Sequence, residues 1–347
     1  MPFISINDIR WKQILDETSY DVYHLQGFAS MEAKLLKGEA LAWWDKIDSK
    51  PILIPLICRN IPYSDYEDLI SPYGYPGILT SASLSKDNIS YALSLFNKEA
   101  AQQSYISTFI RLNPLINSWA IPEKDNWLHL KNGATVSVDL SIDYSLIRKN
   151  YSDNHKRNIN RLQVLGHTYN INNWEYLSDF ASAYIQTMRR LKAQSYYFFP
   201  PSYFNGLQIL LKEKLHFINV LDEKGKFVSG GIFTLFNGVM QYHLGATTNG
   251  SLNMSPSKLM MEAAIIEGKK RGARILHLGG GYGGSYKDGL LRFKNGFSNT
   301  LHAFSTLRMI HRPEIYKDLV NSKIGSQNGV NGFFPEYRTP STIIETA

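Results

Sequence analysis

The stretch FVSGGIFTLFNGVMQYHLGA, residues 227–246, decides the fold class of the second half of the chain. Two apolar runs, Phe227–Phe236 and Val239–Ala246, flank Asn237-Gly238, and this dipeptide between apolar runs is the strongest local signal for a β-hairpin. A further apolar run, His216–Leu221, precedes them across the short polar spacer 222–225. The pattern predicts three consecutive strands joined by tight turns.

Helical patterns surround these strands. Downstream, we expect a helix from Pro256 to about Arg271 and then a strand at Arg274–Leu278. Upstream, the periodicity of apolar residues predicts helices at 147–165, 174–193 and 202–214. The first half alternates in the same way, with an alternating patch at 22–25 before a helical stretch, strands at 40–44, 51–58, 105–110 and 134–139, and a helix at 88–103. Strands interleaved with helices indicate an α/β protein.

Length and charge favour two domains. The 347 residues fit two domains of ordinary size, which we place at 1–143 and 144–347. The net charge of +7 is unevenly distributed, because residues 1–143 hold 12 Lys and Arg against 17 Asp and Glu, a net of −5, and the remainder holds 25 against 13, a net of +12. A basic second domain predicts an anionic ligand, although solvated helix faces explain an excess of basic residues equally well.

Several kinds of site are not indicated. Cys58, the one cysteine, lies in the apolar run 51–58 and is expected to be a buried thiol, neither a nucleophile nor a metal ligand. Neither a Gly-x-Ser-x-Gly elbow nor a zinc motif occurs, and His243 and His277 are interpreted as structural residues within strands. The chain shows no secretory signal and no run of the roughly 18 apolar residues that cross a membrane, so we expect a soluble, cytoplasmic protein without a bound metal.

Two segments of the second half carry candidate chemistry. A glycine-rich run at 279–284 follows an expected strand and would let backbone amides approach a ligand, although a flexible connector would look the same. Downstream, Lys294 lies between Phe293 and Phe297, a pattern that predicts an ammonium presented to an anion or a developing oxyanion. The basic residues of the expected helix 147–165 form a stripe able to meet phosphates.

Four pieces of the second half occur in an order that resembles a known family. They are Asn154–Gly166, Thr187-Met-Arg-Arg190, Met240–Thr247, and the helix 256–272 running into His277-Leu-Gly-Gly280 and Phe293-Lys294. This ordered set resembles the FemABX-like peptidoglycan-bridge aminoacyltransferases and their acyltransferase relatives in the GNAT superfamily. The resemblance implies two GNAT-like domains, each a mixed twisted sheet flanked by helices, with the active cleft between them.

The resemblance also implies an activity and a set of site residues. In family members a substrate amine attacks an activated acyl carbonyl, and no covalent enzyme intermediate forms. The resemblance implies that Lys294 is catalytic and that the substrate is bound by Phe293, Arg190, Tyr242 and Tyr73. The loop 249–256 lacks the usual GNAT pyrophosphate pattern, but Asn253, Ser255 and Ser257 at the start of a helix are expected to bind the donor.

The donor and the acceptor stay open. The resemblance implies aminoacyl-tRNA or acyl-CoA as the donor, and the expected helices at 150–165 and 174–214 are too short for the coiled-coil arm of some tRNA-using relatives. The acceptor is expected to be an amine of a cell-envelope precursor or an amino sugar, either small, lipid-linked or nucleotide-linked, with tRNA as a partner. The alternatives are a CoA-dependent N-acyltransferase of polysaccharide or small-molecule biosynthesis and a non-catalytic module that binds an anionic ligand.

Overall fold

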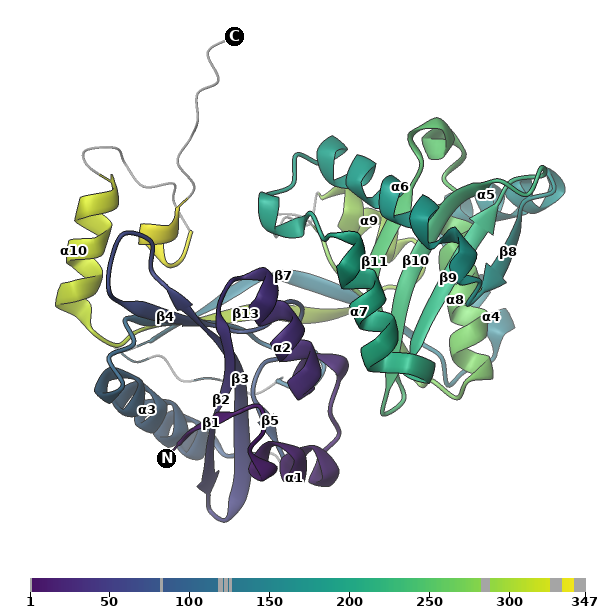
Figure 1. The fold of residues 1–347 in the computed structure, drawn as a ribbon. Coiled ribbons are helices and arrows are strands. Elements are labelled where there is room, and N and C mark those ends of the chain that lie inside the picture. Colours follow the sequence, from purple (N-terminus) through teal and green to yellow (C-terminus); the bar gives the residue numbers. More distant parts are fainter. Residues whose placement is uncertain are drawn as a thin grey trace, which may run out of the picture. The chain divides into compact units, whose positions relative to one another are not determined.

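The structure is a computed structural model that describes residues 2–81, 84–117, 121, 124, 127–281, 288–324 and 333–339. The chain forms two compact units, shown in Figure 1. Unit 1 comprises Met1–Ser19, Tyr23–Lys131 and Ser305–Ala347, and unit 2 comprises Tyr20–Val22 and Asn132–Phe304. This division differs from the expected domains 1–143 and 144–347, because the chain passes between the units inside strands β7 (Trp127–Asp139) and β13 (Thr300–Ile310).

The chain from Ser305 onward belongs to unit 1, because β13 and residues 337–338 form hydrogen bonds with other residues of that unit. Thr306–Ile310 of β13 pair antiparallel with Ser107–Arg111 of β6. Farther along, the fully buried carboxylate of Asp68 accepts hydrogen bonds from the Tyr337 hydroxyl (3.0 Å) and from Nε of Arg338 (2.5 Å). The second expected domain therefore ends near Phe304 instead of at the end of the chain.

Unit 1 has the strand order β1-β2-β3-β4-β6-β13, with β5 paired to β3. Its other elements are β1 (Phe3–Ser5), α1 (Ile9–Glu17), α2 (Gln26–Leu35), β2 (Glu39–Ile47), β3 (Lys50–Asn60), β4 (Glu67–Ile70), β5 (Leu79–Thr80), α3 (Lys86–Gln102), β6 (Ser107–Arg111), α10 (Pro313–Ile324) and the 3-10 turn η6 (Glu336–Arg338). The 3-10 turn η1 (Val22–His24) occupies the alternating patch and spans the boundary between the units.

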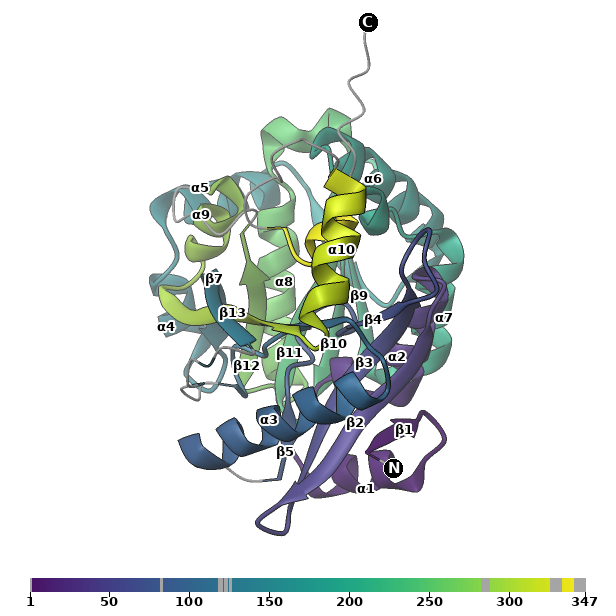
Figure 2. The same ribbon diagram turned by 90° about the vertical axis from the view of Figure 1, so that its left-hand side faces the viewer.

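The hairpin of β2 and β3 is the centre of unit 1. Asp48 and Ser49 make the two-residue turn, and both have positive φ (49° and 63°), as such a turn requires. Every residue of β3 from Ile52 to Cys58 is buried, so both faces of the strand are covered. Figure 2 shows α3 lying across β2, where Phe96 contacts Trp43, and α1 and α2 also contact this hairpin. The strands expected at 40–44 and 51–58 are confirmed as β2 and β3, and Cys58 is a free buried thiol.

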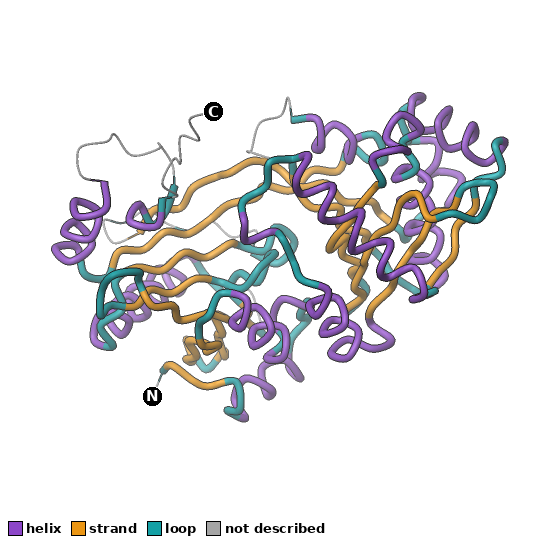
Figure 3. Tube along the Cα trace, turned by 45° about the horizontal axis from the view of Figure 1, so that its top comes forward, coloured by secondary structure: helices purple, strands orange, loops and turns teal. Residues whose placement is uncertain are grey.

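Unit 2 has the strand order β7-β12-β11-β10-β9-β8. Its elements, besides β7, are α4 (Tyr144–Lys149), α5 (Asp153–Val164), β8 (Thr168–Ile171), η2 (Trp174–Tyr176), α6 (Leu177–Arg190), η3 (Ser195–Tyr197), α7 (Pro201–Leu211), η4 (Lys212–Lys214), β9 (Leu215–Leu221), β10 (Phe227–Phe236), β11 (Val239–Thr247), η5 (Asn249–Met254), α8 (Ser257–Lys270), β12 (Ile275–Gly280) and α9 (Gly289–Asn295). Figure 3 shows these helices packed against the strands of the unit. The predicted hairpin is confirmed, with Phe236 paired to Val239 across Asn237-Gly238.

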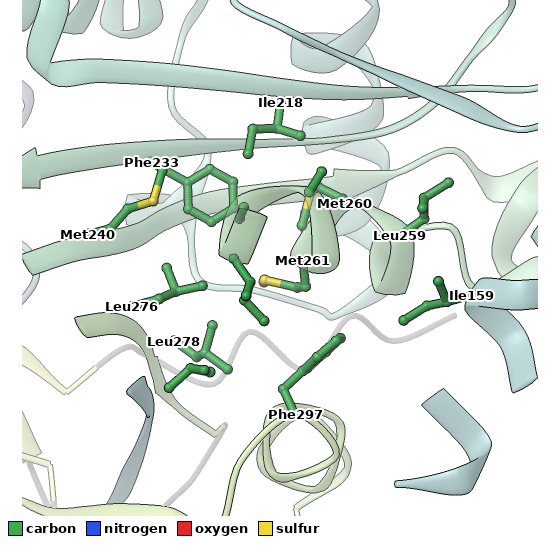
Figure 4. Packing of buried hydrophobic residues seen from close by; sticks show 14 of the residues in the cluster. Ile159, Ile218, Phe233, Met240, Leu259, Met260, Met261, Leu276, Leu278 and Phe297 are labelled. Carbon is green, nitrogen blue, oxygen red and sulfur yellow. The ribbon is translucent and has the colours of Figure 1, made fainter. Parts of the chain in front are cut away.

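Helices cover both faces of the unit 2 sheet. A Cβ atom on Gly230 would contact Phe180 of α6, and one on the next residue, Gly231, would contact Met260 of α8. Because successive residues of a strand point to opposite faces, α6 and α8 lie on opposite sides of β10. The helix α8 is buried nearly all round, and Figure 4 shows Met260 and Met261 among the apolar side chains of the strands and Phe297.

The expected single helix at 147–165 is wrong, because the structure has two helices there. The chain leaves α4 after Lys149, and Ser152 caps the start of α5 by accepting the backbone N–H of His155 (3.3 Å). The N–H of Ser152 donates to the carbonyl of Gly296 (2.8 Å), so this N–H does not form the hydrogen bond that a continuous helix would require of it. Among the described residues, the structure has no helix that combines the length and the apolar character needed to cross a bilayer.

Candidate active site

Strands β11 and β12 separate within unit 2, and this separation has a local cause in each strand. Their parallel pairing covers Val239–Gln241 and Ile275–His277, although β11 continues to Thr247 and β12 to Gly280. In β11 the register against β10 shifts directly afterwards, so His243 is an extra residue. In β12 the register against β7 shifts after His277, so Leu278 is an extra residue too. Such bulges bend a strand, and here both follow the last paired residues.

The bulge in β11 fixes the place of Tyr242. The register puts Tyr242 opposite Phe233 and Gly245 opposite Gly231, so Tyr242 and Gly245 face the same side of the sheet. The Tyr242 ring stacks on Phe233 with a centroid separation of 5.2 Å. A Cβ atom on Gly245 would lie 1.7 Å from the Tyr242 hydroxyl oxygen, so the phenol lies directly over this glycine. Burial raises the pKa of Tyr242, so its hydroxyl stays protonated at neutral pH.

Lys294 lies beside Tyr242. It belongs to α9, whose start Asp288 caps by accepting the N–H of Leu291 (2.8 Å). The lysine is only 6 % exposed, its Nζ donates to the carbonyl of Gly280 at 2.5 Å, and Nζ lies 5.8 Å from the centre of the Tyr242 ring. Burial lowers the pKa of Lys294 to about 7, against an opposing effect of Asp288. A nearly buried ammonium that exchanges its proton near neutrality can stabilise negative charge on a reacting atom.

The aromatic neighbours of Lys294 in the sequence lie elsewhere than expected. Phe293 and Phe297 are four residues apart, share a side of the α9 segment and contact each other, with ring centres 5.6 Å apart. Both also contact the ring of His155 from α5. The ring that faces the ammonium of Lys294 is that of Tyr242. Phe293 therefore serves the packing of α9, and a direct contact with substrate stays a proposal.

A buried chain of polar side chains ends at the last paired residues of β11 and β12. Nδ1 of His277 lies 2.6 Å from Oε1 of Gln241, and Nε2 of Gln241 donates to the carboxylate of Asp21. All three side chains are buried. Burial raises the pKa of Asp21 to about 6, whereas burial and the charge of Lys294 lower the pKa of His277 to about 3. His277 is thus a neutral, hydrogen-bonded residue, in keeping with its structural interpretation.

Arg190 and the expected donor-binding residues lie around the start of α8. Arg190 is exposed, and its guanidinium donates to Oδ1 of Asn249 (2.6 Å) and to the Thr187 hydroxyl (3.2 Å). Asn249 begins η5, which also contains Asn253; Ser255 follows with a positive φ of 52°, and Ser257 is the first residue of α8. The start of α8 has no side-chain cap, and the N–H of Lys258 in its first turn bonds the carbonyl of Ser255 (3.1 Å). At the other end of η5, Nη2 of Arg161 lies 3.6 Å from the Met254 sulfur.

The predicted site residues therefore fall into separate groups. Lys294 lies against the ring of Tyr242, whereas Arg190 bonds Asn249 at the start of η5. Tyr73 belongs to unit 1, on the segment between β4 and β5. Most of the glycine-rich run lies outside the described residues, which omit 282–287. A hollow of about 460 Å³ in unit 2 is lined by residues that include His167, Glu223 and Met254, and none of the predicted site residues lines it.

His155, Asp21 and Gln241 were not predicted as site residues. Each reaches its partner across a long stretch of chain, so the sequence near each residue does not show the pairing. A polar residue at an otherwise apolar strand or helix position was the available signal, as at Gln241 between Met240 and Tyr242. Among the described residues, no group of His, Cys, Asp and Glu side chains is arranged to hold a metal ion.

Comparisons with known proteins give the fold. No family model matches the chain, and no curated protein matches it. Among solved structures, FemX matches with a TM-score of 0.69 at 14 % identity over 91 % of this chain and 99 % of FemX. A tandem GNAT protein from the clavulanic acid biosynthesis pathway, described as without AcCoA, matches with a TM-score of 0.51 at 9 % identity over 90 % of this chain and 98 % of its own. The chain has a tandem GNAT fold.

A third match has the same character. L-PGS from Bacillus licheniformis superposes on the tandem GNAT fold of this chain with a TM-score of 0.55 at 13 % identity, over 93 % of this chain and 99 % of L-PGS. At such identities the similarity concerns the fold, and the chemistry depends on the residues of this chain. The expected α/β architecture of two GNAT-like parts is confirmed.

Proposed function

We propose that the chain is an acyltransferase or aminoacyltransferase that moves an activated acyl group to an amine by direct attack. The observation that supports it best is the position of Lys294, a nearly buried ammonium beside Tyr242 where β11 and β12 separate. In this reaction the amine nitrogen bonds to the acyl carbon, and the carbonyl oxygen becomes negative. Lys294 in its protonated form stabilises that charge. The C–S or C–O bond of the donor then breaks, its electron pair leaves with the thiolate or alkoxide, and this leaving group takes up the proton that the amine loses.

The start of α8 supplies a place for phosphates in this proposal. The uncapped N-terminus of α8 attracts anions, and Asn253, Ser255 and Ser257 offer polar groups there. Arg190 adds a positive charge at the beginning of η5 through its bond to Asn249. Coenzyme A, aminoacyl-tRNA and a nucleotide- or lipid-linked acceptor all carry phosphate, so this placement supports a phosphorylated ligand without choosing among them.

The acceptor we propose is an amine of a cell-envelope precursor or an amino sugar, as in the proteins that this sequence resembles. The match to a tandem GNAT protein described with reference to AcCoA favours acetyl-CoA as the first donor to test. Phe293 of unit 2 is proposed to contact the acceptor.

The proposal is tested by donor binding and by turnover. Thermal unfolding is measured with acetyl-CoA, CoA and charged tRNA in parallel, and a donor at about 100 times its Kd stabilises the folded chain by about 2.7 kcal/mol. Turnover of the stabilising donor with a panel of amino sugars is then compared for the wild type and Lys294→Ala, where a loss of roughly 100- to 1000-fold is expected with donor binding retained. Lys224→Ala, which removes an exposed lysine of the β9–β10 turn, is the matched control. Full turnover in Lys294→Ala would exclude the proposed role of the lysine.

A further inference from the structure

The carboxyl end of α9 is held by a segment far away in the sequence. The N–H of Ser152 donates to the carbonyl of Gly296 (2.8 Å), and Nε2 of His155 lies 2.9 Å from the carbonyl oxygen of Phe293. The Phe293 carbonyl also accepts the N–H of Gly296 (3.1 Å), so His155 adds a second partner to it, and Ser152 supplies a partner to the carbonyl of Gly296. The start of α5 thus caps the end of α9.

The contacts of His155 define its proton positions. A carbonyl oxygen only accepts hydrogen bonds, so Nε2 of His155 carries the proton that it donates to Phe293. Nδ1 then accepts from the Ser152 hydroxyl, which lies 3.0 Å away. Burial lowers the pKa of His155 to about 4, and the nearby charge of Lys258 on α8 acts in the same direction. The imidazole is therefore neutral at physiological pH.

Close packing against Phe297 and Gly296 restricts the position of the His155 ring. The ring is 5 % exposed and packs edge-on to Phe297 with ring centres 4.5 Å apart. A Cβ atom on Gly296 would lie 2.3 Å from the imidazole carbon Cε1, so the absence of a side chain at Gly296 makes the approach possible. The hydrogen bond to Phe293 is thus held by close contact on the side of α9.

We propose that His155 is a positioning residue for Lys294. The carbonyl of Phe293 belongs to the peptide group that joins Phe293 to Lys294. By bonding this carbonyl, the imidazole holds the orientation of that peptide group and so the direction of the Lys294 side chain. This keeps Nζ at the carbonyl of Gly280, beside Tyr242, and away from water. The inference rests on the proposed function, because it treats Lys294 as the group that has to be held in place.

The experiment measures the titration of Lys294 directly and requires no turnover. The protein is labelled with 13C at lysine Cε, the Lys294 signal is assigned with Lys294→Arg, and its shift is followed from pH 5.5 to 10.5. The groups that face Lys294 are Asp288, His277 and Tyr242, and all are left intact. The wild type is expected to titrate near pH 7.

Two substitutions of His155 separate hydrogen bonding from packing. His155→Phe retains a ring but no donor, and the Lys294 titration is expected to rise by about one pH unit or more as the side chain gains water. His155→Gln retains an N–H donor and is expected to restore most of the wild-type value. Gly296→Ala retains every polar group but displaces the ring, and it is expected to act like His155→Phe; it also serves if His155→Phe does not fold.

The outcomes divide cleanly. An unchanged Lys294 titration in a folded His155→Phe or Gly296→Ala protein overturns the inference, and so does an equal shift in His155→Gln and His155→Phe. A shift in His155→Phe that His155→Gln reverses supports it. If no donor binds or turns over and the titration still shifts in this way, the proposed function fails while the positioning by His155 stands.

Discussion

The hydroxyl oxygen of Tyr242 lies directly over Gly245, at the place where any other residue would have its Cβ atom. The two residues face the same side of β11 because His243 is an extra residue between them. Gly245 therefore determines how far the phenol reaches along the strand, and the phenol is the ring against which the Lys294 ammonium lies.

We predict that Gly245→Ala displaces Tyr242. The new methyl group would meet the hydroxyl oxygen at 1.7 Å, and relief of such an overlap in a packed region costs about 1–3 kcal/mol of the free energy of unfolding. Urea unfolding followed by circular dichroism measures this loss. Gly250→Ala is the control for stability, because a Cβ atom there meets nothing within 4 Å. Equal stability of the two variants would contradict the placement of Tyr242.

We predict that stability depends on pH through Lys294. Between pH 7 and the ordinary lysine pKa of 10.5, the folded chain holds less of a proton on Lys294 than the unfolded chain does. The free energy of unfolding contributed by this group therefore rises with pH across that interval and is constant below it. Lys294→Met lacks the group, so the wild type gains stability relative to Lys294→Met as the pH rises from 7 to 10. A flat difference between the two proteins would show that the pKa of Lys294 is not lowered.

Turnover, once a donor and an acceptor are identified, should respond to the same proton. The protonated lysine stabilises the oxyanion, so kcat should fall by about tenfold per pH unit above pH 7 until another path dominates. Lys294→Arg keeps its charge at every pH in this range, so its residual activity should lack that descent. A descent at the same pH in both proteins would assign the proton to another group.

We predict that Asp21→Asn stabilises the chain more at pH 7 than at pH 4. The pKa of Asp21 lies near 6 in the folded chain against an ordinary value of 3.8, so the folded chain binds the extra proton between these values. The wild type consequently loses about 2 kcal/mol of stability as the pH rises from 4 to 6, and Asp21→Asn does not. The difference in urea midpoint across this range is the measurement. Asp16→Asn, at an exposed carboxylate, is the control.

We predict that Asp68→Asn loosens residues 333–339. The Asp68 carboxylate bonds Arg59, Arg338 and Tyr337 at once, and loss of its charge leaves arginine side chains without their counter-ion. Breaking a buried ion pair in this way costs about 3–5 kcal/mol. Hydrogen exchange of the Arg338 and Thr339 amides should quicken, whereas Asp65→Asn, at an exposed position nearby, should leave it unchanged. Exchange unchanged in Asp68→Asn would mean that other contacts hold this segment.

The sequence predicts elements well where the signal is local. The strand at 227–236 agrees with the structure to the residue, because the polar spacer before it and the Asn237-Gly238 turn after it fix its two ends, while its residues are buried almost throughout. The break between α4 and α5 was missed, because it depends on Ser152 bonding to Gly296, which lies 144 positions farther along the chain. The patch at 22–25 was likewise ambiguous, since the Asp21 carboxylate bonds the N–H of Val22 and favours the 3-10 turn η1.

Some residues of the candidate site could be predicted from the sequence, and others depend on contacts between distant segments. Lys294 could be singled out from the sequence because it lies between Phe293 and Phe297. That its ammonium meets Tyr242 instead of Phe297 depends on the rotation of α9, which His155 and Gly296 set from a distance. Asp21, Gln241 and His277 show that buried polar partners from three segments leave no combined trace in any one of them.

The extra residue in β11 has a consequence for how this chain can vary in length. Removal of His243 would leave Tyr242 and Gly245 facing their present side, because the two residues of a bulge together oppose a single partner residue. The shortened strand would still face the second irregularity, because Leu278 remains an extra residue in β12, and it would lose the His243 imidazole, whose Nε2 lies 3.0 Å from the Tyr203 hydroxyl. A one-codon deletion here would thus remove a buried contact and change the path of β11 beside Lys294, so stability and function together favour the present length of this strand.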